Sequence, residues 1–164
     1  MLIAASVIAL RPVQKRQKSL YLHAFIAIFF GGVFTLLMVV FGVLDLHPWY
    51  EPRFLIPIAG MIFANSMNAV SISAERFESE IKRKNSYIDA RATSYKAALI
   101  PIVNALFAVG LVSLPGMMTG QILSGVDPLV AVRYQIMVML MILGSAGISV
   151  AIYLLLLKKD VAAS

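Results

Sequence analysis

The segment FIAIFFGGVFTLLMVVFGVL, residues 25–44, contains no charged side chain. A helix of this length crosses the hydrocarbon core of a bilayer, which is roughly 30 Å thick, because each residue adds about 1.5 Å. A helix is also favoured in lipid because it satisfies its own backbone hydrogen bonds. Three further uncharged stretches approach this length, at residues 54–74, 97–114 and 136–157. We therefore predict an all-α polytopic membrane protein with four full transmembrane helices.

The composition of the whole chain supports a membrane location. Of its 164 residues, 60% are hydrophobic and only 13% are charged, whereas soluble domains carry roughly 25% charged residues. The apolar residues 1–10 are too few to span a bilayer, and we expect them to be a truncated N-terminal helix whose start is missing. We treat residues 1–164 as a single transmembrane domain. Because the chain has no Cys, we expect neither disulfides nor thiolate metal sites.

The basic residues are distributed unevenly along the chain. Twelve of the fourteen Lys and Arg residues fall in residues 11–18, in residues 75–96 and after residue 157, and two fall in residues 45–53 and 115–135. The positive-inside rule places the richer set in the cytoplasm, which predicts a cytoplasmic C-terminus. The loop at 45–53 is then external, with Trp49 and Tyr50 at the level of the lipid headgroups. Basic residues confined to such loops argue for membrane topology and against nucleic-acid binding.

Residues 75–96 are predicted to form a cytoplasmic helical hairpin. Glu78 precedes Lys82 by four residues, and Glu80 precedes Lys84 by four, an order that supports a helix. The second transmembrane helix should therefore continue to about Lys84. The motif SYID, residues 86–89, matches a capping box, so a new helix should begin at Tyr87.

This hairpin has two possible roles. It is either a solvated charged turn or a docking surface for a partner, since Phe77, Ile81, Ile88 and Tyr95 offer apolar contacts beside the charges.

The second predicted helix carries a polar face. Pro57, Met61, Asn65 and Asn68 fall within one sector at 100° per residue. Buried amides in lipid need partners, which are other helices or a passing solute. Structural packing and a role in lining a transport pathway both remain open. The candidate lining residues are Met61, Asn65, Asn68 and Asn104, the last being the expected protein partner of the other amides.

Residues 110–128, GLVSLPGMMTGQILSGVDP, interrupt two apolar runs on the predicted external side. Pro115 is expected to end the third helix, and Asp127 followed by Pro128 should start the last one. Irregular backbone near the membrane survives only where protein or a water-filled cavity covers it. We therefore expect a short re-entrant or interfacial helix that acts as an external gate. The candidate gate residues are Pro115, Gly116, Met117, Met118, Gly120, Gly125 and Asp127.

Sequence motifs for enzymatic chemistry are missing from the chain. No phosphate-binding Gly-x-x-x-x-Gly-Lys-Ser/Thr motif occurs, so any ATP must be hydrolysed by another subunit. The two histidines, His23 and His47, are separated by a predicted span, and neither lies near a carboxylate at a spacing typical of metal ligands. We expect no catalytic residue, no confident metal site and no cofactor.

Three motifs resemble one family of membrane proteins. They are IPIAGMI at 56–62, followed by Asn65, AALIP at 97–101, and the long segment GLVSLPGMMTGQILSGVDPLVAVRYQIMV at 110–138. On these motifs the chain resembles the FetB-type membrane subunits of iron-export ABC transporters, a family that includes plant proteins linked to aluminium tolerance. The resemblance covers essentially the whole chain. Family members are longer, with about seven spans, and their first two spans and much of the third have no counterpart here.

The resemblance implies a permease subunit in the bacterial inner membrane that exports metal ions, with iron as substrate. Two copies would pair with two copies of a cytosolic ATP-binding subunit. Coupling to that subunit would run through the hairpin at 75–96, with Tyr87, Asp89, Arg91 and Tyr95 as candidate residues. The sequence itself shows no carboxylate-rich pathway for a hard cation. A secondary transporter or channel without an ATPase, a purely structural membrane protein and a non-functional fragment remain as alternatives.

Overall fold

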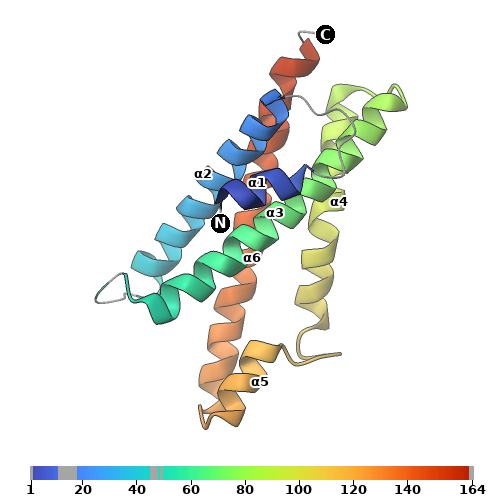
Figure 1. Ribbon diagram of the computed structural model, residues 1–164. Coiled ribbons are helices and arrows are strands. Elements are labelled where there is room, and N and C mark those ends of the chain that lie inside the picture. Colours follow the sequence, from blue (N-terminus) through green and yellow to red (C-terminus); the bar gives the residue numbers. More distant parts are fainter. Residues whose placement is uncertain (1, 11–17, 45–47, 49, 163–164) are drawn as a thin grey trace.

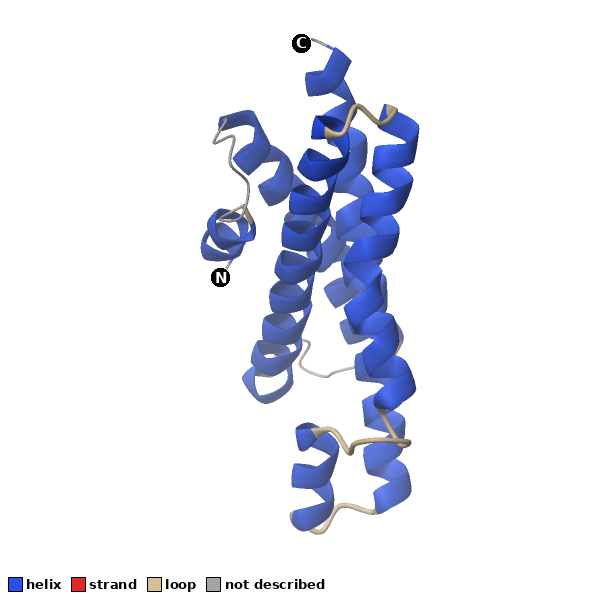
Figure 2. Ribbon diagram, turned by 90° about the vertical axis from the view of Figure 1, so that its right-hand side faces the viewer, coloured by secondary structure: helices blue, strands red, loops and turns tan. Residues whose placement is uncertain are grey.

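The computed structural model describes residues 2–10, 18–44, 48 and 50–162. In these ranges the chain forms six helices and no named strand (Figures 1 and 2). The helices are α1 (Leu2–Ala9), α2 (Lys18–Gly42), α3 (Pro52–Lys82), α4 (Tyr87–Ala108), α5 (Gly116–Leu123) and α6 (Pro128–Ala162). The predicted all-α class is confirmed. The basic segment 11–17, His47 and Trp49 lie outside the described residues, and so do the predictions made for them.

Three of the four predicted spans are helices long and apolar enough to cross a membrane. Within the described residues these are Ser19–Gly42, Pro52–Lys82 and Pro128–Leu157. The fourth, predicted at residues 97–114, is helical only as far as Ala108. Its uncharged helical part, residues 97–108, is about 18 Å long at 1.5 Å per residue, which is shorter than the hydrocarbon core.

The long helices pack around α6. α6 contacts α2, α3 and α4 along its length, and the short α1 lies across α2 and α3 (Figure 1). The start of α2, the turn between α3 and α4, and the end of α6 lie at one end of the molecule, and α5 lies at the other. The turn between α3 and α4 and the end of α6, both predicted to be cytoplasmic, therefore share one end.

Small residues permit these helices to approach closely. A Cβ added to Gly31 of α2 would lie 2.8 Å from the backbone nitrogen of Ser149 in α6, and one added to Gly32 would lie 2.5 Å from the ring of Phe63 in α3. Ser66 and Ser73 of α3, like Ser149, are completely buried. Small side chains at helix contacts are typical of membrane proteins, where dispersion forces between closely packed backbones replace hydrophobic collapse.

Candidate functional site

The turn between α3 and α4 is fixed by its own backbone. The backbone N–H of Asn85 donates to the carbonyl of Glu80 (3.3 Å), and that of Lys84 donates to the carbonyl of Ile81 (2.9 Å). These two bonds form a Schellman motif, which ends a helix with one residue in the left-handed conformation. That residue is Lys84, with φ of 60°. A lysine therefore occupies a position where glycine is usual.

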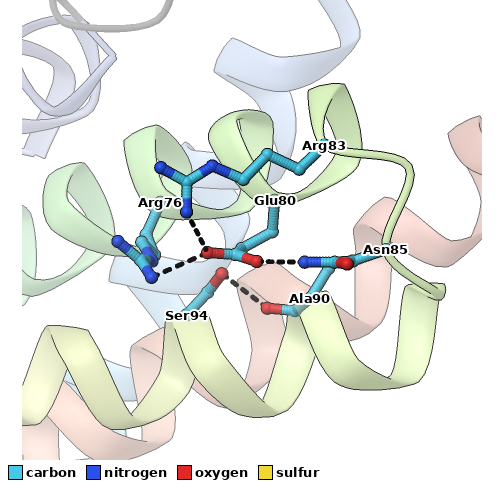
Figure 3. A network of polar contacts seen from close by, with 6 residues as sticks. All are labelled: Arg76, Glu80, Arg83, Asn85, Ala90 and Ser94. Atoms are coloured by element: carbon cyan, nitrogen blue, oxygen red, sulfur yellow. Dashed lines mark hydrogen bonds and ion pairs between the residues drawn. The ribbon is translucent and has the colours of Figure 1, made fainter.

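A buried carboxylate reinforces this turn (Figure 3). The side chain of Glu80 is only 6% exposed and lies 2.7 Å from the guanidinium of Arg76 and 3.8 Å from that of Arg83. Its second oxygen accepts a hydrogen bond from the side-chain amide of Asn85. The predicted pairing of Glu80 with Lys84 is wrong, because the positive φ of Lys84 takes it out of the helix. The predicted pair between Glu78 and Lys82 is confirmed at 2.9 Å.

The start of α4 matches the sequence prediction. Ser86 is the N-cap, and its hydroxyl oxygen accepts the backbone N–H of Asp89 at 3.2 Å. The same hydroxyl donates to the Asp89 carboxylate at 2.6 Å. In a standard capping box the acidic side chain accepts the N-cap backbone N–H; here it accepts the hydroxyl instead. The helix begins at Tyr87, as predicted.

Two of the four candidate coupling residues face α6 rather than solvent. The Tyr87 hydroxyl donates to the backbone carbonyl of Leu154 at 2.6 Å, and its ring packs edge-on against Phe77 with centroids 5.8 Å apart. A Cβ added to Gly147 of α6 would lie 3.3 Å from the hydroxyl of Tyr95. Asp89 is exposed and Arg91 is half-buried. The hairpin is thus tied to α6 through its tyrosines.

The polar face of α3 opens onto a cavity of about 200 Å³ between α3, α4 and α6. Asn65 and Asn68 line it together with Pro101 of α4 and Met139 of α6. Because Pro101 has no N–H, the Ala97 carbonyl one turn earlier lacks its helical donor. Ala97 itself does not line the cavity, whose wall combines the two amides with apolar side chains.

The other two candidate lining residues lie elsewhere. Met61 and Asn104 are not among the residues that line this cavity, and Asn104 is exposed. The side-chain amide nitrogen of Asn65 donates to the backbone carbonyl of Met61 at 2.9 Å. The expected pairing of Asn104 with the other amides is therefore wrong, because the helix backbone supplies the partner of Asn65.

The interruption after α4 begins earlier than predicted. Pro115 was expected to end the third helix, but α4 already ends at Ala108. Gly110, with φ of 82°, turns the chain, and its N–H donates to the carbonyl of Ser113 at 3.1 Å. Pro115 is instead the N-cap of α5. Gly110 adopts this positive φ without a Cβ clash, so the chain has already left the helix five residues before Pro115.

The short helix expected in this stretch exists as α5, which is set apart at one end of the molecule (Figure 2). It ends in a second Schellman motif, in which Gly125 has φ of 88° and the N–H of Val126 donates to the carbonyl of Gln121 at 3.0 Å. The Asp127 carboxylate then accepts the N–H of Leu129 at 2.8 Å, which confirms it as the cap of α6. Gly116 and Gly120 have no positive φ, and a Cβ at either would meet nothing within 4 Å.

One polar residue at this end was missed by the sequence analysis. Gln135 of α6 is 4% exposed, and its carbonyl oxygen has no hydrogen-bond partner among the described residues. It lines a cavity of about 320 Å³ together with Met118 of α5 and Leu106 of α4. The sequence analysis expects the last span to start at Ile136, which leaves Gln135 in the preceding loop. An amide directly before an apolar run is the sequence signal that points to it.

Comparison with known proteins places the chain among membrane proteins. The model of the uncharacterised protein family UPF0014 matches residues 1–161. A UPF0014 membrane protein of Synechocystis sp. is 37% identical over 158 residues, covering 87% of this chain and 61% of the relative. The "Probable iron export permease protein FetB" of Escherichia coli is 39% identical over 158 residues, covering 85% of this chain and 60% of the relative.

A plant protein is also similar. The "Protein ALUMINUM SENSITIVE 3" of Arabidopsis thaliana is 33% identical over 139 residues, covering 76% of this chain and 50% of the relative. No solved structure matches the chain. The chain spans about three fifths of the length of the first two relatives.

Proposed function

The chain belongs to the UPF0014 family of membrane proteins, and from this membership we propose that it is a permease subunit of an ABC transporter that exports metal ions. Iron is the proposed substrate, and a separate cytosolic subunit would hydrolyse ATP. The observation that carries this proposal is the 39% identity with a relative named as an iron export permease. We place the subunit in the bacterial inner membrane with a cytoplasmic C-terminus, as the distribution of Lys and Arg predicts.

The hairpin supports a coupling route from the ATP-binding subunit to the membrane helices. In this proposal two permease copies pair with two ATP-binding subunits, which contact the hairpin around the exposed Asp89 and the half-buried Arg91. Glu80 and the Ser86 cap hold the tip rigid. Tyr87 and Tyr95 then pass its displacement to α6, through the bond to Leu154 and the contact with Gly147. A displacement changes transport only if the inward and outward states bind the solute differently.

The amide-lined cavity supports a position for the solute pathway. The side-chain amides of Asn65 and Asn68 offer neutral oxygen ligands at the wall of an otherwise apolar cavity. Met61 and Asn104 would join this lining only in another state of the transporter, because neither lines the cavity here. We propose that the segment from Pro115 to Asp127, including Gly116, Met117, Met118, Gly120 and Gly125, is the external gate. In this role α5 moves with α6, the helix it contacts.

Copurification tests the partnership. A tagged full-length relative, purified in mild detergent, is expected to retain a cytosolic ATP-binding protein. Iron content tests the substrate: cells that lack the permease should accumulate more iron under iron load. A secondary transporter or channel predicts transport without any ATPase. Transport that persists after deletion of the ATP-binding subunit would contradict the proposal.

Replacing Tyr87 by Phe tests the coupling route. This change removes the hydroxyl that bonds to Leu154 and keeps the ring against Phe77. We expect ATPase association to persist while transport per ATP hydrolysed falls severalfold. Tyr134→Phe, a half-buried tyrosine of α6 far from the hairpin in sequence, is the matched control. An unchanged transport-to-hydrolysis ratio in Tyr87→Phe would assign coupling to other contacts.

A further inference from the structure

A groove of about 430 Å³ runs between α4 and α6 on the hairpin side of the molecule. Its polar wall comes from α4 and contains Arg91, Tyr95 and Lys96. Its apolar wall comes from α6 and contains Ala151, Leu154 and Leu155. The amide cavity between α3, α4 and α6 shares no lining residue with this groove.

The two cations of the groove, like Lys84 at the turn, differ from the remaining three cations of the hairpin. Arg76, Lys82 and Arg83 each pair with a glutamate. Arg91 and Lys96 form no ion pair with any carboxylate in the described part of the chain, and no acidic residue lines the groove. Two uncompensated cations that share one groove create a positive potential, which favours an anionic ligand.

The groove also crosses the expected boundary between lipid and water. Its apolar wall belongs to the candidate span Pro128–Leu157 and lies near the end of that span. Lys96 immediately precedes the uncharged run of α4 that starts at Ala97. Leu155 is 56% exposed, which is expected of a side chain that contacts acyl chains. The ligand therefore needs an anionic head and an apolar tail.

We propose that this groove binds one anionic phospholipid. Arg91 and Lys96 contact the phosphate. One acyl chain lies along Ala151 and Leu155, and the buried Leu154 forms the floor of the groove. Basic pockets between membrane helices on the cytoplasmic side bind anionic headgroups by this combination of charge and apolar surface. The inference does not depend on the transported solute.

A lipid in this groove contacts α4 and α6, the two helices that Tyr87 and Tyr95 also connect. Tyr95 lines the groove, and Leu154 accepts the Tyr87 hydroxyl bond. The bound lipid would therefore contact both α4 and α6, next to the hydrogen bond from Tyr87 to Leu154 that ties the hairpin to α6. The composition of the inner leaflet would thus influence how firmly the hairpin is held.

Lipid binding by the purified chain tests the proposal. The protein is delipidated in detergent, titrated with phosphatidylglycerol or phosphatidylcholine, and analysed by native mass spectrometry. Each cation near an anionic lipid contributes roughly fivefold to binding, so R91Q/K96Q should weaken the first phosphatidylglycerol site about 30-fold. K82Q/R83Q removes the same charge from the same hairpin and should leave that site within about twofold. The charge-preserving variant R91K/K96R should retain the site, which assigns the loss in R91Q/K96Q to the missing charges.

Further titrations distinguish binding of a whole lipid from binding of its headgroup alone. Inorganic phosphate and glycerol 3-phosphate, which lack the tail, should not displace phosphatidylglycerol at millimolar concentration. Displacement by either would show an anion site without a lipid site and would overturn the proposal. Equal affinity for phosphatidylcholine, or equal losses in R91Q/K96Q and K82Q/R83Q, would also overturn it.

Discussion

Gly31 lies at a close crossing of α2 and α6, where the absence of a side chain is required. An added Cβ would meet the backbone of Ser149, including its nitrogen at 2.8 Å, and backbone cannot rotate away. We predict that Gly31→Ala destabilises the protein by about 1–3 kcal/mol, the usual cost of overpacking. Thermal unfolding in detergent measures the effect.

The matched control is Gly144→Ala in α6, where a Cβ meets nothing within 4 Å. Alanine is favoured over glycine in a helix interior by about 1 kcal/mol, so this variant should be neutral or stabilising. Equal losses in the two variants would show that packing at Gly31 is not the cause.

Lys84 carries a conformational cost at the end of α3. Its φ of 60° is costly for a residue with a Cβ and free for glycine. We predict that Lys84→Gly raises the unfolding free energy by about 1 kcal/mol. Lys84→Ala loses the same charge but keeps the Cβ, so it should bring no such gain. A gain in both variants would mean that charge repulsion in the basic turn, and not backbone strain, limits stability.

At the scale of elements, the hairpin depends on a carboxylate whose partners the sequence did not identify. Glu80 joins α3 to the turn through Arg76, Arg83 and Asn85. We predict that Glu80→Gln keeps the helices but loses the ion pairs, so the amides around residues 83–87 should exchange their hydrogens faster. Glu75→Gln, an exposed glutamate of the same helix, is the control. Unchanged exchange rates in Glu80→Gln would show that the Schellman bonds hold the turn alone.

The stretch at residues 110–128 contains glycines in two different backbone conformations, which the sequence alone does not distinguish. Gly125 has φ of 88°, whereas Gly116 begins α5 without a positive φ. We predict that Gly125→Val costs about 1–3 kcal/mol of stability through backbone strain and that Gly116→Val costs less. Thermal unfolding of the two variants checks this order. A larger loss of stability in Gly116→Val would contradict this prediction. It would imply that Gly116 contacts another part of the protein in a different state.

Local patterns were predicted well from the sequence, and tertiary partners were not. The cap at Ser86, the cap at Asp127 and the pair between Glu78 and Lys82 depend on neighbours within four residues, and all three were confirmed. The predicted end of α4 is wrong because the prediction relied on Pro115, whereas the chain already turns at Gly110, which has a positive φ. The partner of Asn65 was misassigned because composition cannot show that an amide bonds to its own helix.

At the scale of the whole molecule, the short helical part of α4 raises the question of whether the chain crosses the membrane there. The turn between α3 and α4 and the end of α6 share one end of the molecule, and α5 lies at the opposite end (Figure 1). The basic residues predict that the first end is cytoplasmic. On that orientation we predict that α4 also crosses the membrane, and that residues 109–115 and α5 span the depth that the short helix does not cover.

Single cysteines test this topology, because the chain contains none of its own. Ser86→Cys should be labelled by a membrane-impermeant maleimide only from the cytoplasmic side. Tyr50→Cys and Leu123→Cys, at positions 58% and 82% exposed, should be labelled only from outside. If Leu123→Cys were labelled from the same side as Ser86→Cys, α4 would not cross and the C-terminus would lie outside. That result would also remove the basis for α5 as an external gate, whereas labelling from opposite sides requires the crossing.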